Sequence, residues 1–170
     1  LSANVGLHEV GALHRDFKAA NILLHNGTAK IADLGFAKIL KNQVVTGTIL
    51  GTSVTMAPEL FENKNYGVQC DVWSVGVVYY QFLFGDYPYN GLNDFEILKK
   101  IKKGPPVFPP AIPVSKQSVD FILKCLTIDP AKRITWKAIY EHPLLQDNMR
   151  DTYGAPPQQD TDEELASEAS

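Results

Sequence analysis

The stretch that decides the fold is His14-Arg15-Asp16-Phe17-Lys18-Ala19-Ala20-Asn21, and Asp33-Leu34-Gly35 follows a short distance later. Together they bring two carboxylates, a lysine and an amide close together in the chain. Mg²⁺ prefers hard oxygen ligands and usually takes one or two carboxylates together with phosphate oxygens and water. These side chains therefore indicate a site for magnesium and phosphate.

The segment between the two motifs explains how they can meet. Ile22–His25 and Thr28–Ala32 are mostly apolar runs on either side of Asn26-Gly27. An Asn-Gly pair in this setting is the strongest short-range signal for a two-residue type I′ hairpin. A hairpin returns the chain to its starting point, so Asn21 and Asp33 are expected to be neighbours and to bind Mg²⁺.

Three motifs in order resemble those of one family. His14-Arg15-Asp16-x-Lys18-x-x-Asn21, Asp33-x-Gly35 and Ala57-Pro58-Glu59 resemble the catalytic loop, magnesium loop and Ala-Pro-Glu motif of eukaryotic protein kinases. Each motif alone could arise by chance, but their order and spacing are specific. The resemblance implies ATP and Mg²⁺ as cofactors and transfer of the γ-phosphate to protein hydroxyls.

The chain has 170 residues, enough for one ordinary domain but fewer than a complete kinase domain. It contains neither G-x-G-x-x-G nor Val-Ala-x-Lys. We therefore expect residues 1–148 to form a mainly α, kinase-like C-terminal lobe, a helix bundle around a central buried helix with a small hairpin at the active site. The N-terminal β lobe is expected to be absent, Leu1–Gly11 to be the last turns of a helix, and 149–170 to be a disordered acidic tail.

The resemblance assigns the chemistry to particular side chains. Asp16 orients the substrate hydroxyl, Lys18 offsets charge on the transferring phosphoryl group, and Asn21 and Asp33 bind the metal. Lysine at position 18 is typical of Ser/Thr kinases, although Ala19-Ala20 faintly resembles tyrosine kinases. Leu23 matches the residue beneath the adenine ring, and ordinary hairpin core is an equally compatible interpretation.

Five further residues match architectural positions of the family. His14 packs and hydrogen-bonds without proton chemistry, and the Thr52 hydroxyl bridges the catalytic aspartate and lysine. Asp71, at the start of the central helix, holds the backbone of the catalytic loop. Glu59 requires a partner because a buried lone carboxylate is costly, and Arg133 occupies the position of that partner.

The segment between Asp33 and Glu59 matches the kinase activation segment. Its middle, residues 41–48, is polar and is expected to be a mobile loop, for which a plain surface loop is as good an interpretation as a regulatory one. Thr48 is the expected activating phosphorylation site, with Thr46 as the second choice. Arg15 and Lys38 would bind the phosphate.

Some positions depart from the family pattern. Leu34 replaces the usual Phe of Asp-Phe-Gly without touching Asp33, and Thr55 replaces a common Tyr, which alters the pocket for the residue after the phosphoacceptor. Ala20 and Gln81 stand where arginine-directed kinases carry glutamates. We therefore predict no strong preference for arginine upstream of the acceptor.

Helices are predicted beyond the central one. The spacing of apolar residues predicts helices over 93–103, 115–126 and 135–145, with Ser115 and Thr135 as N-caps. Gly104–Pro113 is Pro-rich and predicts an extended connector. The lysines of the 93–103 segment form either a docking patch for an acidic partner or an ordinary solvated face.

Composition limits the remaining function classes. A net charge of −3 argues against nucleic-acid binding, and Cys70 and Cys125 lack metal-site spacing. The apolar run Val72–Phe84 is shorter than the roughly 20 residues of a membrane span, and Leu1–Leu13 does not resemble a signal peptide. The expected location is cytoplasmic or nuclear, and the expected partners are a protein substrate and the missing lobe.

Two functional classes remain open from the sequence. The parent protein could be an active Ser/Thr kinase, similar to the autophagy-initiating (ULK-like) or calcium/calmodulin-dependent groups, with this chain inactive when isolated. Alternatively, the chain could be a non-catalytic interaction module or a pseudokinase-like decoy.

Overall fold

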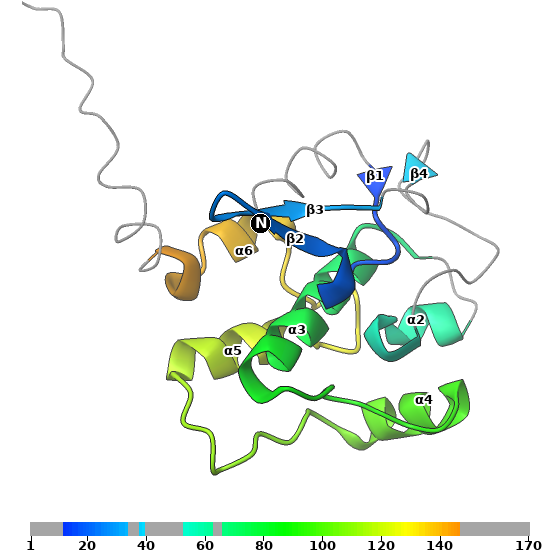
Figure 1. Ribbon diagram of the computed structural model, residues 1–170. Helices are drawn as coiled ribbons and strands as arrows, with labels where there is room; N and C mark the ends of the chain where they lie inside the picture. Colours follow the sequence, from blue (N-terminus) through cyan, green and yellow to red (C-terminus); the bar gives the residue numbers. More distant parts are fainter. Residues whose placement is uncertain (1–11, 34–37, 40–52, 63–65, 147–170) are drawn as a thin grey trace, which may run out of the picture.

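The computed structural model describes residues 12–33, 38–39, 53–62 and 66–146. The described part is rich in helix and carries two small antiparallel sheets (Figure 1). The elements, in chain order, are β1 (Ala12–Leu13), η1 (Ala19–Asn21), β2 (Ile22–His25), β3 (Thr28–Ile31), β4 (Lys38–Ile39), η2 (Ser53–Thr55), α2 (Pro58–Phe61), α3 (Gln69–Phe84), α4 (Asp94–Lys103), α5 (Lys116–Cys125) and α6 (Trp136–Tyr140).

Helix α3 is the predicted central helix. Of its first ten residues, all but Gln69 are buried. A helix that is apolar on most sides must be covered on most sides. Trp73 and Val77 of α3 pack in one core cluster with α4, whereas Val72 and Val75 pack in a second with α5 and α6. Both halves of the core therefore meet at α3, which confirms the predicted bundle around a buried helix.

A close helix crossing joins α3 to α5. A Cβ atom built on Gly76 would lie 2.5 Å from the Cβ of Cys125. Only a residue without a side chain allows the two helices to approach this closely. At its other end, α3 stops at Gly85, whose φ of 73° is the left-handed conformation typical of a helix C-terminus.

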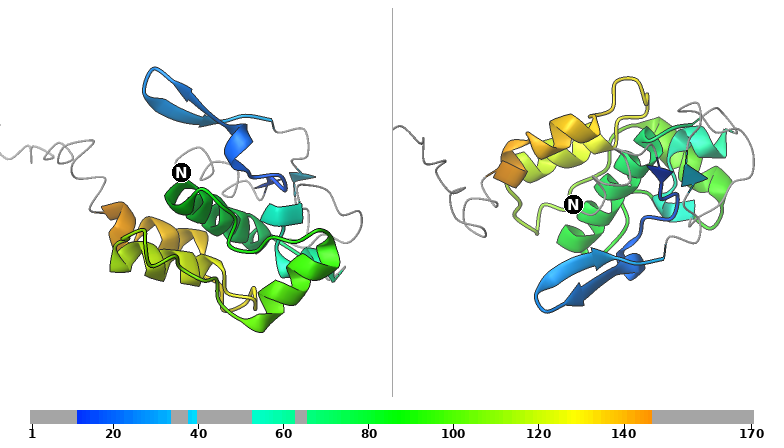
Figure 2. Two further views of the ribbon diagram at one scale, coloured as in Figure 1. Left: turned by 60° about the horizontal axis from the view of Figure 1, so that its bottom comes forward. Right: turned by 90° about the horizontal axis from the view of Figure 1, so that it is seen from above.

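The predicted β2–β3 hairpin is confirmed. Ile22 pairs with Ile31 and His25 pairs with Thr28, which leaves Asn26-Gly27 as the two-residue turn. Both turn residues have positive φ, 49° and 74°, as a type I′ turn requires. Figure 2 shows the hairpin standing out from the helices.

The ladder of β1 with β4, which pairs Leu13 with Lys38, was not predicted. Two residues per strand are too few to produce a readable alternation of apolar and polar side chains.

Helices α5 and α6 begin at the predicted N-caps, Ser115 and Thr135, and α4 begins at Asn93, a cap that was not predicted. Side chains of Asn93, Ser115 and Thr135 each accept a hydrogen bond from the backbone N–H three residues later. The helix predicted over 135–145 is wrong in its length, because α6 ends at Tyr140 and a separate short helical turn covers 143–146. Pro143 has no N–H to continue the helix, and its ring clashes with the preceding turn.

Residues 104–113 contain no helix or strand, as predicted for the connector. Two tyrosines of the core hold it in place. The Tyr80 hydroxyl donates to the carbonyl of Val107 at 2.6 Å, and the Tyr89 hydroxyl donates to that of Gly104 at 3.1 Å. Among the described helices, none has both the length and the apolar character needed to cross a membrane. The expectations for Leu1–Gly11, for the 41–48 loop and for the tail from 149 onward fall outside the described residues.

Candidate functional site

The loop of residues 14–21 is held by Asp71, from the first turn of α3. The backbone N–H of His14 donates to Asp71 Oδ2 at 2.7 Å, and that of Arg15 donates to Oδ1 at 3.0 Å. Burial raises the pKa of Asp71, and the two N–H donors oppose that rise. Arg15 has a φ of 67°, a strained conformation for a residue with a side chain. The contact predicted between Asp71 and the loop backbone is therefore present. It holds Arg15, whose positive φ the isolated chain would not favour.

Asp16 lies at the centre of the loop and is only 2% exposed. Lys18 Nζ lies 2.6 Å from Asp16 Oδ2. Asn21 Nδ2 donates to the Asp16 backbone carbonyl at 3.0 Å and lies 3.4 Å from Oδ2. The three side chains assigned to catalysis by resemblance thus meet at one carboxylate, because η1 turns the chain back after Lys18.

His14 is fully buried behind this group. Its Nδ1 accepts a hydrogen bond from the Asp16 N–H at 3.3 Å, and its ring meets that of Phe17 edge to face at 6.0 Å. Within the described part of the chain, His14 Nε2 has no hydrogen-bond partner. Its packing and its bond to the Asp16 backbone agree with the positioning role implied by the resemblance.

Asn21 and Asp33 lie at the open end of the hairpin. The N–H of Ala32 donates to the Asn21 carbonyl at 2.8 Å, which brings the residue before Asp33 onto Asn21. Since Nδ2 of Asn21 is engaged with Asp16, the side-chain atom left for a cation is the oxygen Oδ1. Asp33 is exposed and has a φ of 60°. An amide oxygen and a carboxylate at the same end of the hairpin fit the donor set that Mg²⁺ takes when phosphates and water complete its shell.

Leu23 lies on the opposite side of the hairpin from Ile22, because successive strand residues alternate between faces. Its side chain is 54% exposed. The interpretation of Leu23 as hairpin core is therefore wrong, whereas Ile22 and Ile31 do pack against the second core cluster. An exposed leucine beside the site is compatible with contact to a ligand or to another part of the protein.

The residues assigned to regulation are only partly described. Lys38 pairs with Leu13 in the β1–β4 ladder, so its backbone lies beside the strand that leads into the 14–21 loop and Arg15. The two candidate phosphorylation sites, Thr46 and Thr48, lie outside the described residues, as does Thr52, to which the resemblance assigned an architectural role.

The predicted ion pair of Glu59 and Arg133 is present, across 74 positions of sequence. Arg133 Nη1 and Nη2 donate to the two carboxylate oxygens at 2.8 and 2.9 Å. The other three guanidinium N–H donors bond to the carbonyls of Gln69, Thr127 and Ile128. All five donors are thus satisfied, as a buried guanidinium requires. The pair ties α2 to the segment before α6.

Sequence reasoning missed two side chains that support this framework. Gln69 Nε2 donates to the backbone carbonyls of Arg133 at 3.1 Å and Ile134 at 3.3 Å. Ser74 Oγ donates to the Thr55 carbonyl at 2.8 Å. Both contacts join segments far apart in the chain, and a single polar residue in an apolar helix carries no signal of its distant partner.

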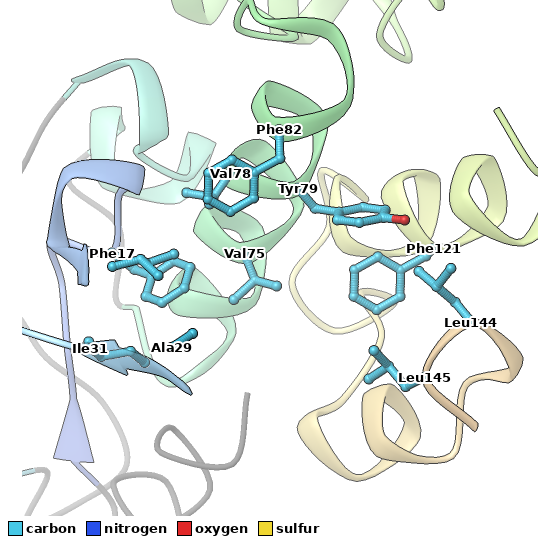
Figure 3. Close-up of a pocket in the computed structure, with 11 residues that line it drawn as sticks. Phe17, Ala29, Ile31, Val75, Val78, Tyr79, Phe82, Phe121, Leu144 and Leu145 are labelled. Atoms are coloured by element: carbon cyan, nitrogen blue, oxygen red, sulfur yellow. The ribbon is translucent and has the colours of Figure 1, made fainter. Parts of the chain in front are cut away.

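An apolar groove of about 250 Å³ lies beside the site, between the hairpin, α3 and the end of the described chain (Figure 3). Phe17 and Ile31 line one wall, α3 lines the floor, and Phe121 and Leu144 line the other wall. Ile22, on the opposite face of the hairpin from Leu23, belongs to the lining. The groove therefore does not include the polar group around Asp16, and its apolar lining does not suit phosphate.

Burial also excludes the cysteines from the chemistry. Cys70 and Cys125 are both free and buried. Burial raises the pKa of each thiol, well above its usual range for Cys70. A thiol that stays protonated is a poor nucleophile and a poor metal ligand.

Comparisons with known proteins agree with this geometry. The family model for the protein kinase domain matches residues 2–145. A probable serine/threonine-protein kinase of Dictyostelium discoideum is 37% identical over 152 residues, which are 88% of this chain and 18% of that protein. Serine/threonine-protein kinase atg1 of the same organism is 34% identical over 151 residues, 86% of this chain and 22% of that protein.

Serine/threonine-protein kinase 36 of Mus musculus is 37% identical over 147 residues, 85% of this chain and 11% of that protein. The chain thus spans less than a quarter of the length of each of these three relatives. The region that the family model matches includes the 14–21 loop, the hairpin and the Glu59–Arg133 pair. The chain therefore belongs to the protein kinase domain family.

Proposed function

We propose that this chain supplies the catalytic and substrate-binding half of a Ser/Thr protein kinase, which transfers the γ-phosphate of ATP to protein hydroxyls. The observation that carries the proposal is the convergence of Lys18 and Asn21 on the buried Asp16, on a loop anchored by Asp71. The names of the three relatives, all serine/threonine kinases, support the substrate class.

The roles follow from position and charge. Asp16 accepts a hydrogen bond from the substrate hydroxyl and orients its oxygen towards the γ-phosphorus. Lys18, already 2.6 Å from Asp16, offsets negative charge on the transferring group. Asn21 keeps Asp16 in place through Nδ2, and its Oδ1 would be the atom that binds the cation. Positioning and electrostatic stabilisation supply most of the rate in phosphoryl transfer.

Asn21 and Asp33 are the residues that would hold Mg²⁺. Bound Mg²⁺ neutralises charge on the phosphates. Leu23, exposed on the outer face of the hairpin, would contact the adenine ring. These assignments are supported by the donor types and by the hairpin, which brings Ala32 onto Asn21.

We assign this chain to the C-terminal lobe and expect a second lobe to complete the ATP site. Two observations support the assignment: the helix-rich architecture and the absence of a G-x-G-x-x-G sequence from the 170 residues. The isolated chain is therefore expected to show little or no phosphoryl transfer.

Phosphorylation of Thr48 is proposed as the activating switch. The phosphate would add nearly two negative charges near Arg15 and Lys38. Mass spectrometry of the active full-length kinase should find Thr48 modified. An active kinase with an unmodified Thr48 would contradict this assignment.

The main test measures phosphoryl transfer by the full-length protein that contains this chain. With γ-labelled ATP and a basic protein substrate, phosphoamino acid analysis should find phosphoserine and phosphothreonine. Asp16→Asn should lower kcat by a factor on the order of 10³ or more, because it removes the hydroxyl-orienting carboxylate. Lys137→Ala, on an exposed position of α6, is the matched control and should leave kcat unchanged. Equal kcat for wild type and Asp16→Asn would instead favour a non-catalytic role.

A further inference from the structure

The outward side of helix α4 is a surface that phosphoryl transfer does not use. The helix buries Ile97 and Ile101, so residues at the complementary spacing point away from the core. The α4 outer face consists of five residues, which line a shallow hollow of about 380 Å³: Phe95, Leu98, Lys99, Lys102 and Lys103. Phe95 is 74% exposed.

Among the described residues, two of the lysines of α4 are bonded to neighbouring side chains and two are not. Lys102 forms an ion pair with Glu62, and Lys100 Nζ donates to Asn90 Oδ1 at 2.8 Å. Within the described part of the chain, no ion pair is recorded for Lys99 or Lys103. Both side chains are exposed, so their charges are available to a partner.

The acidic residues of the helix lie at its other end. Asp94 and Glu96 are in the first turn, and Glu96 is engaged by the Leu92 N–H at 2.9 Å. The lysines thus form a basic end of the helix in a chain whose net charge is −3.

A purely solvated helix end would explain part of this pattern. Lysines near a helix C-terminus interact favourably with the helix dipole. That effect accounts for charge but not for an aromatic ring and a leucine that share the same hollow. Exposed apolar side chains rimmed by polar residues are typical of surfaces that bind another protein.

We propose that the α4 outer face is a docking site for an acidic segment of a partner protein. The segment would place one large apolar side chain against Phe95 and Leu98 and carboxylates on Lys99 and Lys103. The charge complementarity selects an acidic partner over a basic one. Helix α4 lies across the helices from the hairpin (Figures 1 and 2), so docking and occupation of the 14–21 loop are compatible. The inference goes beyond the proposed function and does not depend on it.

The test begins with a displayed library of random peptides selected on the 170-residue chain. Selected peptides should be enriched in Asp and Glu around one Leu, Ile or Phe. A fluorescently labelled selected peptide is then titrated by anisotropy. Lys99→Glu/Lys103→Glu should weaken binding about tenfold, and Phe95→Ser should do the same. Raising the NaCl concentration to about 0.5 M should weaken binding to the wild-type chain, because exposed charges are screened.

The matched control is Lys116→Glu/Lys137→Glu, which reverses the same number of charges on exposed positions of α5 and α6. Its affinity should equal that of the wild type, and thermal unfolding should show that all variants are folded. Selection of peptides without acidic enrichment, or equal affinity in the α4 variants, would overturn the proposal.

Two further outcomes would assign the face to another occupant and would also overturn it. A synthetic peptide of residues 158–170, which is acidic and contains Leu165, could displace the selected peptide with equal affinity. Alternatively, sedimentation could detect a dimer that Lys99→Glu/Lys103→Glu dissociates.

Discussion

Asp71 binds the backbone of His14 at 2.7 Å across 57 positions of sequence, and the same carboxylate also accepts the N–H of Arg15. The start of the central helix therefore sets the conformation of the loop that carries Asp16.

Asp71→Ala should destabilise the fold and disturb the loop. The substitution leaves two backbone N–H groups without their acceptor, at about 1–3 kcal/mol for each buried group. Urea unfolding should show a loss on the order of 2–4 kcal/mol. Asp86→Ala is the control, since Asp86 is exposed and, among the described residues, its carboxylate accepts a hydrogen bond only from the neighbouring N–H of Tyr87. Equal losses for the two variants would show that the Asp71 contacts are not stabilising.

Arg133→Met should cost about 3–5 kcal/mol of unfolding free energy, because it leaves Glu59 buried without its partner. Glu59→Gln should cost less, since the amide oxygen still accepts from the guanidinium. Lys132→Met, on the neighbouring exposed residue, should change stability by less than about 0.5 kcal/mol. A loss for Arg133→Met no larger than that control would contradict a structural role for the pair.

Gly76→Ala should lower stability although alanine is the better helix former. The added Cβ would lie 2.5 Å from the Cβ of Cys125, and overpacking of this kind typically costs about 1–3 kcal/mol. Cys125→Ala should not rescue the variant, because it keeps the Cβ that clashes, whereas Cys125→Gly should relieve the clash. A rise in Tm for Gly76→Ala would show that α3 and α5 separate easily.

The stability contributed by Asp120 should depend on pH. Hydrogen bonds from Lys124 at 2.7 Å and then from His142 at 2.9 Å hold the pKa of Asp120 below its ordinary value of 3.8. Since the folded state favours the ionised form, this contribution is present above pH 3.8 and is lost as the pH falls through the lower, folded-state pKa.

The measurement compares urea unfolding of wild type and Asp120→Asn between about pH 2.5 and 7. The wild type should exceed Asp120→Asn in unfolding free energy by the largest amount near neutral pH, and this excess should shrink in acid. It should be modest because Asp120 is half exposed. Lys124→Met removes the hydrogen-bond donor that lowers the pKa of Asp120 most. It should therefore weaken the dependence of this stability difference on pH. A difference that grows in acid would show that the folded state does not favour the ionised carboxylate.

The full-length kinase should show no strong preference for arginine upstream of the phosphoacceptor. Ala20 and Gln81 supply no carboxylate at the positions where arginine-directed kinases carry glutamates. A peptide array should therefore show little arginine enrichment, and Ala20→Glu/Gln81→Glu should increase it. An array dominated by arginine-containing substrates of the wild type would refute the prediction.

Local structure was readable wherever neighbouring residues decide it. Asn26-Gly27 predicted the hairpin and its turn type, because few other pairs tolerate two positive φ angles. Ser115 and Thr135 predicted helix starts through their capping side chains. The end of α6 was predicted wrongly, because the apolar spacing favoured a longer helix and the stop signal of Pro143 was not used.

The candidate site was predictable as a set of residues, because its motifs are contiguous and their order is specific. Its supports were predictable only where the family resemblance named the distant partner, as for Glu59 and Arg133. The resemblance named no partner for Gln69 or Ser74. Their side chains bind backbone carbonyls of distant segments, and the positions of those carbonyls depend on how the helices pack.

The sequence by itself thus determined the residue types of the site, the hairpin that brings Ala32 onto Asn21, and the identity of the central helix. The tertiary structure alone decided which faces stay open. It placed Leu23 outside the core, left an apolar groove between the hairpin and α5, and turned Phe95 towards solvent. The physical reason is that turns and caps depend on neighbouring residues, whereas burial depends on the packing of segments that are distant in the chain.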